Sequence, residues 1–439
     1  MNFADTVRIV TNIMLFFLEA VLAHFAIFAI IGIFAKRSYP KTDKKLRYGM
    51  IIPARNEESV VAGLIESIQK NRYPQDNLRI FVIAHNCSDD TARVAREAGA
   101  IVYEYNNPAE NTMGYAFRYL FEQIDRDFGI KTFDGYFLFN ADNILDKDYI
   151  SRMNDAFVDC GGESVITSFR NSKNFGTNLI SGLYGMYFTV GCRLESRGRT
   201  VAGCSTRVQG TGYLISSDIV ENGWNYVTLA EDWEFSADRV LRGNNIRYCD
   251  DAIFYDEQPT SLRIMWRQRV RWSRGHLIVF YTRIKDLLRG IFGKGTKNRV
   301  SVYDITANVL PSTLLFLAIQ CVQIILLLIS PLIDPNCDLK SIFLGSSPGL
   351  FTSDGVLFGI IKGMIYSYIT VFASSVLIFV IERKRIRKVS FLYKVLISLI
   401  WPIFLAIQVP MDVQAFFSRK LGWKPIPHND TTTFEHVNR

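Results

Sequence analysis

The sequence predicts an α/β domain with a mostly parallel sheet, joined to several membrane-spanning helices. Between residues 48 and 260, short apolar runs alternate with amphipathic helical patterns, which is typical of a parallel sheet covered on both faces. Four apolar stretches elsewhere have about the 20 residues that cross a bilayer. The 439 residues carry a formal net charge of +8 and are 49% hydrophobic, which favours a membrane protein with a cytoplasmic face over a nucleic-acid binder.

The first apolar stretch covers residues 9–35. It is too long for the core of a signal peptide and has no small-residue cleavage site, so we expect an uncleaved transmembrane anchor. Six lysines and arginines follow it between residues 36 and 47. By the positive-inside rule, residues 1–35 form an anchor whose N-terminus lies outside, and residues 36–260 form a cytoplasmic domain.

The apolar runs YGMIIPA, LRIFVIAH, AIVYEY and GYFLFN are the first predicted strands of this domain, and helical patterns separate them. Parallel sheets bind ligands beyond the carboxyl ends of their strands. Polar clusters follow three of these runs, at residues 55–57, 86–90 and 140–143. We therefore expect the functional site at this edge of the sheet.

The second half of the chain is basic and then apolar. Residues 261–300 are amphipathic, which suits a membrane surface, and residues 301–418 contain predicted spans at about 307–332 and 357–381. The last apolar stretch carries Pro402 and Pro410, and a basic segment follows it. Because a straight span would place that segment outside, we expect a bent or re-entrant hairpin, with a plain fourth span as the alternative. Residues 419–439 then form a cytoplasmic tail.

The stretch RIMWRQRVRWSRGH at 263–276 places five arginines within twelve residues. On a helix, Gln268, Arg271, Trp272 and Gly275 share one face. A guanidinium binds two phosphate oxygens at once, and an indole covers the apolar face of a sugar ring. A basic helix facing lipid headgroups explains the pattern equally well.

Three weaker motifs lie upstream of this stretch. In NADN, Asn140 and Asp142 offer two oxygen ligands for a hard divalent cation, although an Asx turn is the common role of such residues. In AEDWEF, Glu231 and Asp232 precede a helix, where they could cap it or one could act as a general base. In GTGYL, the glycines would let the backbone approach a ligand.

In this chain order, the motifs resemble those of the processive membrane branch of glycosyltransferase family 2, which includes cellulose, hyaluronan and poly-N-acetylglucosamine synthases. The resemblance covers residues 45–280 by motif, and the Glu-Asp pair followed by QRVRW is its specific part. It implies a GT-A fold, Mg²⁺ or Mn²⁺, and a UDP-sugar donor, with UDP-glucose or UDP-N-acetylglucosamine expected. It also implies an inverting hexosyltransferase that extends a β-linked glycan and exports it across the plasma membrane.

The resemblance assigns roles to particular residues. Asp142 and Asn140 would bind the metal, and Asp232 would be the catalytic base with Glu231 beside it. Trp423 and Lys424 would belong to a loop that reaches over the donor site when it is loaded. Donor binding falls to Ala54, Arg55, Glu57, Asn86, Asp89, Asp90 and Arg271, and acceptor or diphosphate binding to Gln268, Trp272, Gly210, Thr211 and Gly212.

The sequence departs from the family pattern at three places. Asn140 stands where aspartate is usual, His85 where aspartate is frequent, and Thr112-Met113-Gly114 where the family has glycine-lysine-glycine. Two other functions stay open, and these departures prompt the second of them. One is the transfer of a single sugar to a lipid-linked acceptor, and the other is a nucleotide-sugar-binding subunit without turnover.

Overall fold

The computed structural model describes residues 2–162, 164–345, 347, 350, 354–386, 389–418, 426 and 428–438. It divides into two compact units. One unit comprises Met1–Phe25 and Leu310–Phe417, and the other comprises Ala26–Val309 and Ser418–Arg439. The second, which contains the sheet, is called the catalytic unit below, and the first is called the helical unit.

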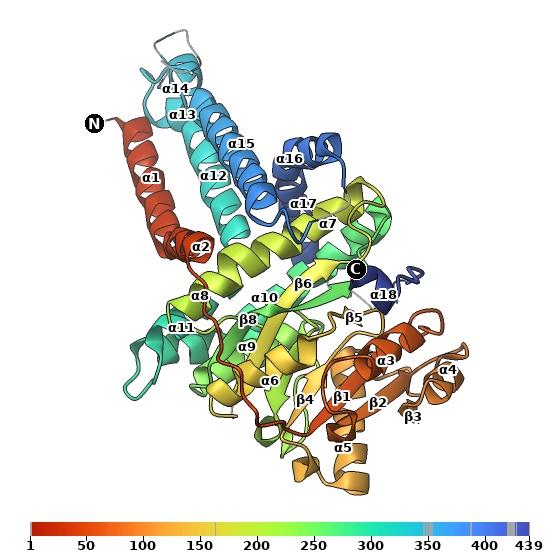
Figure 1. Ribbon diagram of the computed structural model, residues 1–439. Helices are drawn as coiled ribbons and strands as arrows, with labels where there is room; N and C mark the ends of the chain where they lie inside the picture. The colour runs from red at the N-terminus through yellow and green to blue at the C-terminus, as the bar shows by residue number, and fades with distance from the viewer. Residues whose placement is uncertain are drawn as a thin grey trace. The chain divides into compact units, whose positions relative to one another are not determined.

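The catalytic unit is built on one eight-stranded sheet with the strand order β3-β2-β1-β4-β7-β6-β8-β5 (Figure 1). Strand β1 runs parallel to β2 and β4, β2 to β3, and β6 to β8, whereas β7 and β5 pair antiparallel with their neighbours. The mostly parallel sheet predicted from the sequence is therefore confirmed. The strands are β1 Tyr48–Ala54, β2 Leu78–His85, β3 Ile101–Tyr105, β4 Gly135–Leu138, β5 Ile144–Leu145, β6 Val165–Ser172, β7 Tyr213–Ser216 and β8 Ile246–Asp256.

Helices cover both faces of this sheet, because successive residues of a buried strand point to opposite faces. In β1, Met50 and Ile52 pack with α3 and α6, while Ile51 packs on the other face with α5. A π-helical turn, Gly191–Ser196, joins α7 to α8. The helices of the unit are α3 Val61–Gln69, α4 Thr91–Glu97, α5 Met113–Phe128, α6 Tyr149–Asp159, α7 Leu179–Val190, α8 Arg197–Val201, α9 Glu231–Leu241, α10 Leu262–Phe292, α11 Arg299–Val309 and α18 Phe434–Val437.

The helical unit holds apolar helices of membrane-spanning length. By length and composition, Phe3–Phe34, Val356–Ile381 and Phe391–Phe417 can each cross a bilayer, and α11 with α12, bent by 58°, makes a fourth candidate. These helices mark a membrane protein, as the sequence predicts. Its elements are α1 Phe3–Leu22, α12 Ser312–Leu328, α13 Ser330–Ile333, α14 Leu339–Leu344, α15 Val356–Ile381, α16 Phe391–Ala406 and α17 Gln408–Phe417, and α2 His24–Phe34 crosses the boundary between the units.

Candidate active site

A cleft of about 1230 Å³, its open mouth included, lies where strands β1, β2 and β4 end. The position is the one expected for a parallel sheet. The cleft is lined by Pro53, Ala54, Arg55, Glu57, His85, Asn111, Met113, Ala116, Asn140, Ala141, Asp142, Arg170, Asp256, Glu257, Gln258, Pro259, Arg267, Gln268, Arg271, Ile426 and His428.

The loop after β4 presents Asp142 to this cleft. The carboxylate is only 3% exposed, and it accepts a hydrogen bond from the Glu257 amide at 2.7 Å. Among the described residues, no group of three or more histidine, cysteine or acidic side chains is placed to hold a metal. A hard cation at Asp142 and Asn140 would thus complete its shell with water and diphosphate oxygens, which is the usual behaviour of Mg²⁺. The donor set fits such an ion.

The GTG turn supports the metal loop from behind. The Thr211 hydroxyl accepts the Asn140 amide at 2.8 Å and donates to the Asn143 side-chain oxygen at 2.5 Å. Gly212 has a φ of +68°, and a Cβ on it would lie 2.1 Å from the Phe254 ring. Gly210, with a φ of +78°, lies in the same turn. Thr211 and Gly212 thus hold the loop in place, while a Cβ on Gly210 would lie 3.8 Å from an Asp232 carboxylate oxygen. The acceptor-binding role of the three residues stays a prediction.

Two neighbouring carboxylates open helix α9. Burial, and then the charge of Asp232, raises the pKa of Glu231 to about 8. Burial also raises the pKa of Asp232, while Arg207 and Arg271 act against it. Two acids this close titrate as a pair, so near neutral pH they share one proton and a carboxylate remains to act as a base.

Helix α10 connects this pair to the cleft. Arg271 lines the cleft, donates to the Leu229 carbonyl at 3.0 Å, and interacts electrostatically with both carboxylates. Gly275 allows the close packing, since a Cβ there would lie 2.4 Å from that of Ala230, the residue before the pair. Gln268 also lines the cleft, and its side-chain oxygen is buried with no hydrogen-bond partner in the described structure. A buried oxygen without a hydrogen bond is energetically unfavourable, and a ligand that donates a hydrogen bond to Gln268 would remove this penalty.

Trp272 lies among aromatic side chains of α7. Its ring centroid is 6.0 Å from that of Tyr184, 6.2 Å from that of Phe188 and 6.4 Å from that of Tyr187, to which it is nearly parallel. The sequence reading did not include this aromatic group. Trp272 and Tyr187 are partly exposed, whereas Tyr184 and Phe188 are buried behind them. The contact of Trp272 with an acceptor sugar stays a prediction.

The loop after β2 differs from expectation. The Asn86 side chain bonds to the backbone of Asn107 at 2.7 and 3.1 Å, and Asp89 accepts the Thr91 amide at the start of α4. Asp90, the residue before that helix, forms an exposed ion pair with Arg93. None of these three predicted donor-binding residues lines the cleft in the described structure, whereas His85, at the end of β2, does.

The C-terminal tail supplies a residue that the sequence reading missed. The His428 Nδ1 lies 2.9 and 3.0 Å from the two carboxylate oxygens of Glu57. Burial alone would lower the pKa of His428, but the charges of Asp142, Glu57 and Glu257 raise it to about 9, so His428 is a cation. The amides of Asn429 and Asp430 donate to Glu257 at 3.0 and 2.8 Å.

Trp423 and Lys424 lie outside the described residues, so their role over the donor site stays a prediction. Residues at the ends of β6 and β8 were also missed. Arg170 pairs with Asp256 at 2.7 Å on the wall of the cleft. Both are polar residues near the carboxyl ends of parallel strands, so the rule used for the other loops could have identified them.

The fold and this site define a GT-A-like nucleotide-sugar transferase. A mannosyltransferase from Pyrobaculum calidifontis, solved with GDP-Man and Mn²⁺, superposes with a TM-score of 0.59 at 13% identity, covering 95% of this chain and 100% of that one. The model for "Glycosyltransferase like family 2" matches residues 47–275, more than half of the chain. The chain therefore belongs to glycosyltransferase family 2 and is an enzyme of that family.

Curated relatives match over the same region. The chain is 26% identical over 255 residues to the probable glycosyltransferase YdaM of Bacillus subtilis, covering 56% of this chain and 59% of the relative. It is 24% identical over 260 residues to a poly-beta-1,6-N-acetyl-D-glucosamine synthase of Staphylococcus aureus, covering 56% and 57%. It is 23% identical over 241 residues to a beta-monoglucosyldiacylglycerol synthase of Trichormus variabilis, covering 52% and 48%. The matches thus span only about half of each relative's length.

Proposed function

We propose that the chain is a membrane-embedded inverting hexosyltransferase that passes a sugar from UDP-glucose or UDP-N-acetylglucosamine to a growing β-linked glycan and exports the product. One observation carries the proposal. Arg271 both lines the cleft and pairs electrostatically with Glu231 and Asp232, so a diphosphate in the cleft would lie beside a carboxylate base. The plasma membrane, with the catalytic unit on the cytoplasmic side, is the proposed location.

In this mechanism, Asp232 takes the proton from an acceptor hydroxyl as its oxygen attacks the anomeric carbon. The bond from that carbon to the diphosphate breaks, and the nucleoside diphosphate leaves. Arg271 and Gln268 hold the leaving group. A divalent cation bound by Asp142 and Asn140 would supply further positive charge for it.

Replacing the base tests this chemistry. Asp232→Asn should lower turnover by roughly 10²–10⁴-fold, the usual contribution of a positioned general base. UDP binding, measured by calorimetry, should persist because the diphosphate is held elsewhere. Glu97→Gln, which removes an exposed carboxylate at the end of α4 instead, is the matched control and should keep most activity. Loss of UDP binding together with turnover would make Asp232 a structural cap.

A lipid is the second candidate acceptor, because a lipid-glycosylating relative matches about as well as a polysaccharide synthase. One experiment identifies both the donor and the acceptor. The purified full chain in lipid nanodiscs would receive UDP-glucose, UDP-N-acetylglucosamine or GDP-mannose. Nucleoside diphosphate release identifies the donor. In mass spectra of the product, a ladder of sugar chains supports the processive function, whereas a lipid carrying one sugar supports the alternative.

A further inference from the structure

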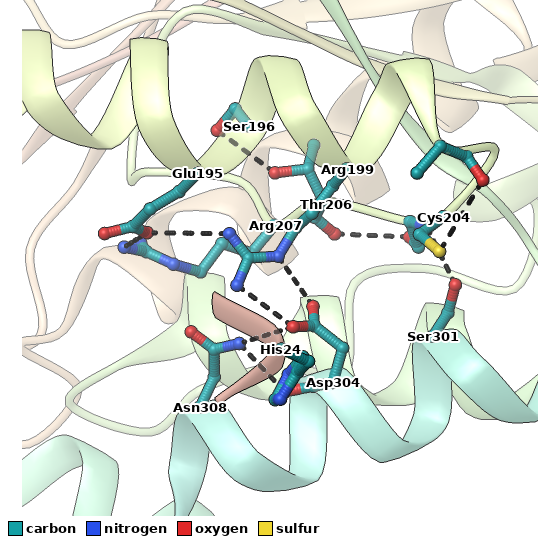
Figure 2. A network of polar contacts seen from close by, with 12 residues as sticks. His24, Glu195, Ser196, Arg199, Cys204, Thr206, Arg207, Ser301, Asp304 and Asn308 are labelled. Atoms are coloured by element: carbon teal, nitrogen blue, oxygen red, sulfur yellow. Dashed lines mark hydrogen bonds and ion pairs between the residues drawn. The ribbon is translucent and has the colours of Figure 1, made fainter. Parts of the chain in front are cut away.

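A chain of charged side chains crosses the catalytic unit away from the cleft (Figure 2). It begins at Asp304 on α11, which Arg199 on α8 contacts with two bonds of 2.7 and 3.0 Å, both side chains being buried. It continues through Glu195, whose carboxylate lies 4.0 Å from Arg199 and 3.2 Å from Arg207. We call these four residues the charge chain. It ends at Arg207, which no ligand-binding motif of the sequence includes.

Arg207 lies against the helix turn that carries the proposed base. Its guanidinium carbon is 4.5 Å from the centre of the Trp233 ring, and the Trp233 amide donates to the Asp232 carboxylate at 2.9 Å. The next residue, Val208, donates its amide to the Ser236 hydroxyl, which in turn donates to the Asp232 carbonyl. The segment that follows Arg207 is thereby joined to the first turn of α9.

The electrostatic surroundings of Asp232 come from several elements. Arg207 opposes the effect of burial on the pKa of Asp232 more strongly than Arg271 does. His276 on α10 stays neutral, because burial and then Arg207 lower its pKa to about 3. The titratable and charged groups around the carboxylate are Glu231 and Glu234 on α9, Arg271 and His276 on α10, Tyr213 on β7, and Arg207.

The two arginines have different positions relative to the donor. Arg271 lines the cleft, where a diphosphate would engage its charge, whereas Arg207 is held by Glu195 and the Trp233 indole. Of the two arginines that act on Asp232 in the described part of the chain, Arg207 is therefore the one still available to the base once the donor is bound. We propose that Arg207 is a positioning residue that holds the Trp233 turn and keeps Asp232 an ionised carboxylate during transfer. This inference rests on the proposed function of Asp232.

The test is the pH profile of kcat/KM for the full chain in nanodiscs, measured as UDP release from UDP-glucose and UDP-N-acetylglucosamine. Without the cation, Asp232 binds its proton more tightly, so Arg207→Gln should move the acid limb to higher pH. At acid pH the loss is about tenfold for each pH unit that the limb moves, and activity returns at high pH. Arg207→Lys keeps the charge and should restore most of the acid limb. Glu195→Gln removes an opposing charge and should give a smaller displacement toward lower pH.

A loss of activity by the same factor at every pH, equal for Arg207→Gln and Arg207→Lys, would overturn the proposal and make Arg207 a packing residue. So would an unmoved acid limb. Infrared spectroscopy can follow the protonation of Asp232 with pH in the absence of turnover, and Asp232→Asn identifies which carboxyl band belongs to that residue. The titration is compared between the wild-type chain and the Arg207 variants. If the wild-type chain released no UDP, the proposed function would fail, while the infrared titration would still decide the role of Arg207.

Discussion

The contact between His428 and Glu57 gives a prediction whose size follows from the structure. Both side chains are mostly buried, 20% and 13% exposed, and the imidazole lies 2.9 Å from the carboxylate. A hydrogen bond between charged groups contributes about 1.5–3 kcal/mol. A rise in the pKa of His428 from near 6.5 to about 9 corresponds to roughly 3 kcal/mol, which agrees with the upper end of that energy range. His428→Ala should thus weaken attachment of the tail about tenfold to a hundredfold.

Hydrogen exchange measures this attachment at the amides of Asn429 and Asp430, which donate to Glu257. In metal-free buffer at pH 7, exchange of the 428–438 peptide should accelerate by that factor in His428→Ala, while helix α5 stays unchanged. Because the folded pKa of His428 is raised, its contribution is complete below about pH 6.5 and is lost as the pH rises through about 9. Glu57→Gln should reduce this pH dependence, and the charges of Asp142 and Glu257 account for the part that remains.

Unchanged exchange in His428→Ala would refute the reasoning. The tail would then be held by its other contacts, such as the 3.0 Å bond from the Lys173 side chain to the Asp430 carbonyl. Accelerated exchange in both the tail and α5 would instead indicate general destabilisation of the catalytic unit.

Two further predictions concern the metal and the side of the membrane on which the tail lies. Asp142→Asn should abolish Mn²⁺ binding, measured by electron paramagnetic resonance with UDP present, and should lower turnover by roughly 10²–10³-fold. Asn140→Asp should keep both Mn²⁺ binding and turnover. Full activity of Asp142→Asn in excess EDTA would contradict the metal assignment. In a version without native cysteines, Thr431→Cys on the tail and Glu97→Cys on α4 should react with an impermeant maleimide from the same side of the membrane. Labelling of one of these cysteines but not the other in intact cells would contradict the tail's attachment to the catalytic unit.

The sheet could be predicted from the sequence because a strand buried on both faces is a continuous apolar run. The strand ends then indicated the edge at which Asp142 lies. The same rule predicts donor contacts for Asn86 and Asp89, which stay predictions because neither lines the cleft in the described structure. Short polar side chains readily bond to nearby backbone, as Asp89 does to the Thr91 amide, whereas Asn86 bonds to the backbone of Asn107, 21 positions away.

Contacts between distant segments could not be predicted. His428 and Glu57 are 371 positions apart, and no local periodicity encodes their pairing. The charge chain is equally hidden, because Arg199 and Asp304 are single charged residues 105 positions apart whose burial depends on how α8 and α11 pack. Local patterns determine elements and strand ends, whereas tertiary packing determines which charges are buried together.

The position of the tail also limits how the chain can cross a membrane. Since the tail binds the catalytic unit, both lie on one side, and an even number of crossings must separate them. In the described part of the chain, three apolar segments intervene: α11 with α12, α15, and α16 with α17. Helix α15 is unbroken over 26 residues, about 39 Å, and α12 with α13 reaches a length of the same order. The last segment contains Pro402, is interrupted at Ile407, and carries Asp412 bonded to Gln408 at 2.6 Å. Phe391–Phe417 is long enough to cross as one span, and among the described helices the pair bent by more than 40° is α11 with α12. A re-entrant arrangement of the last segment therefore stays a prediction, motivated by parity and by the polar pair inside the segment.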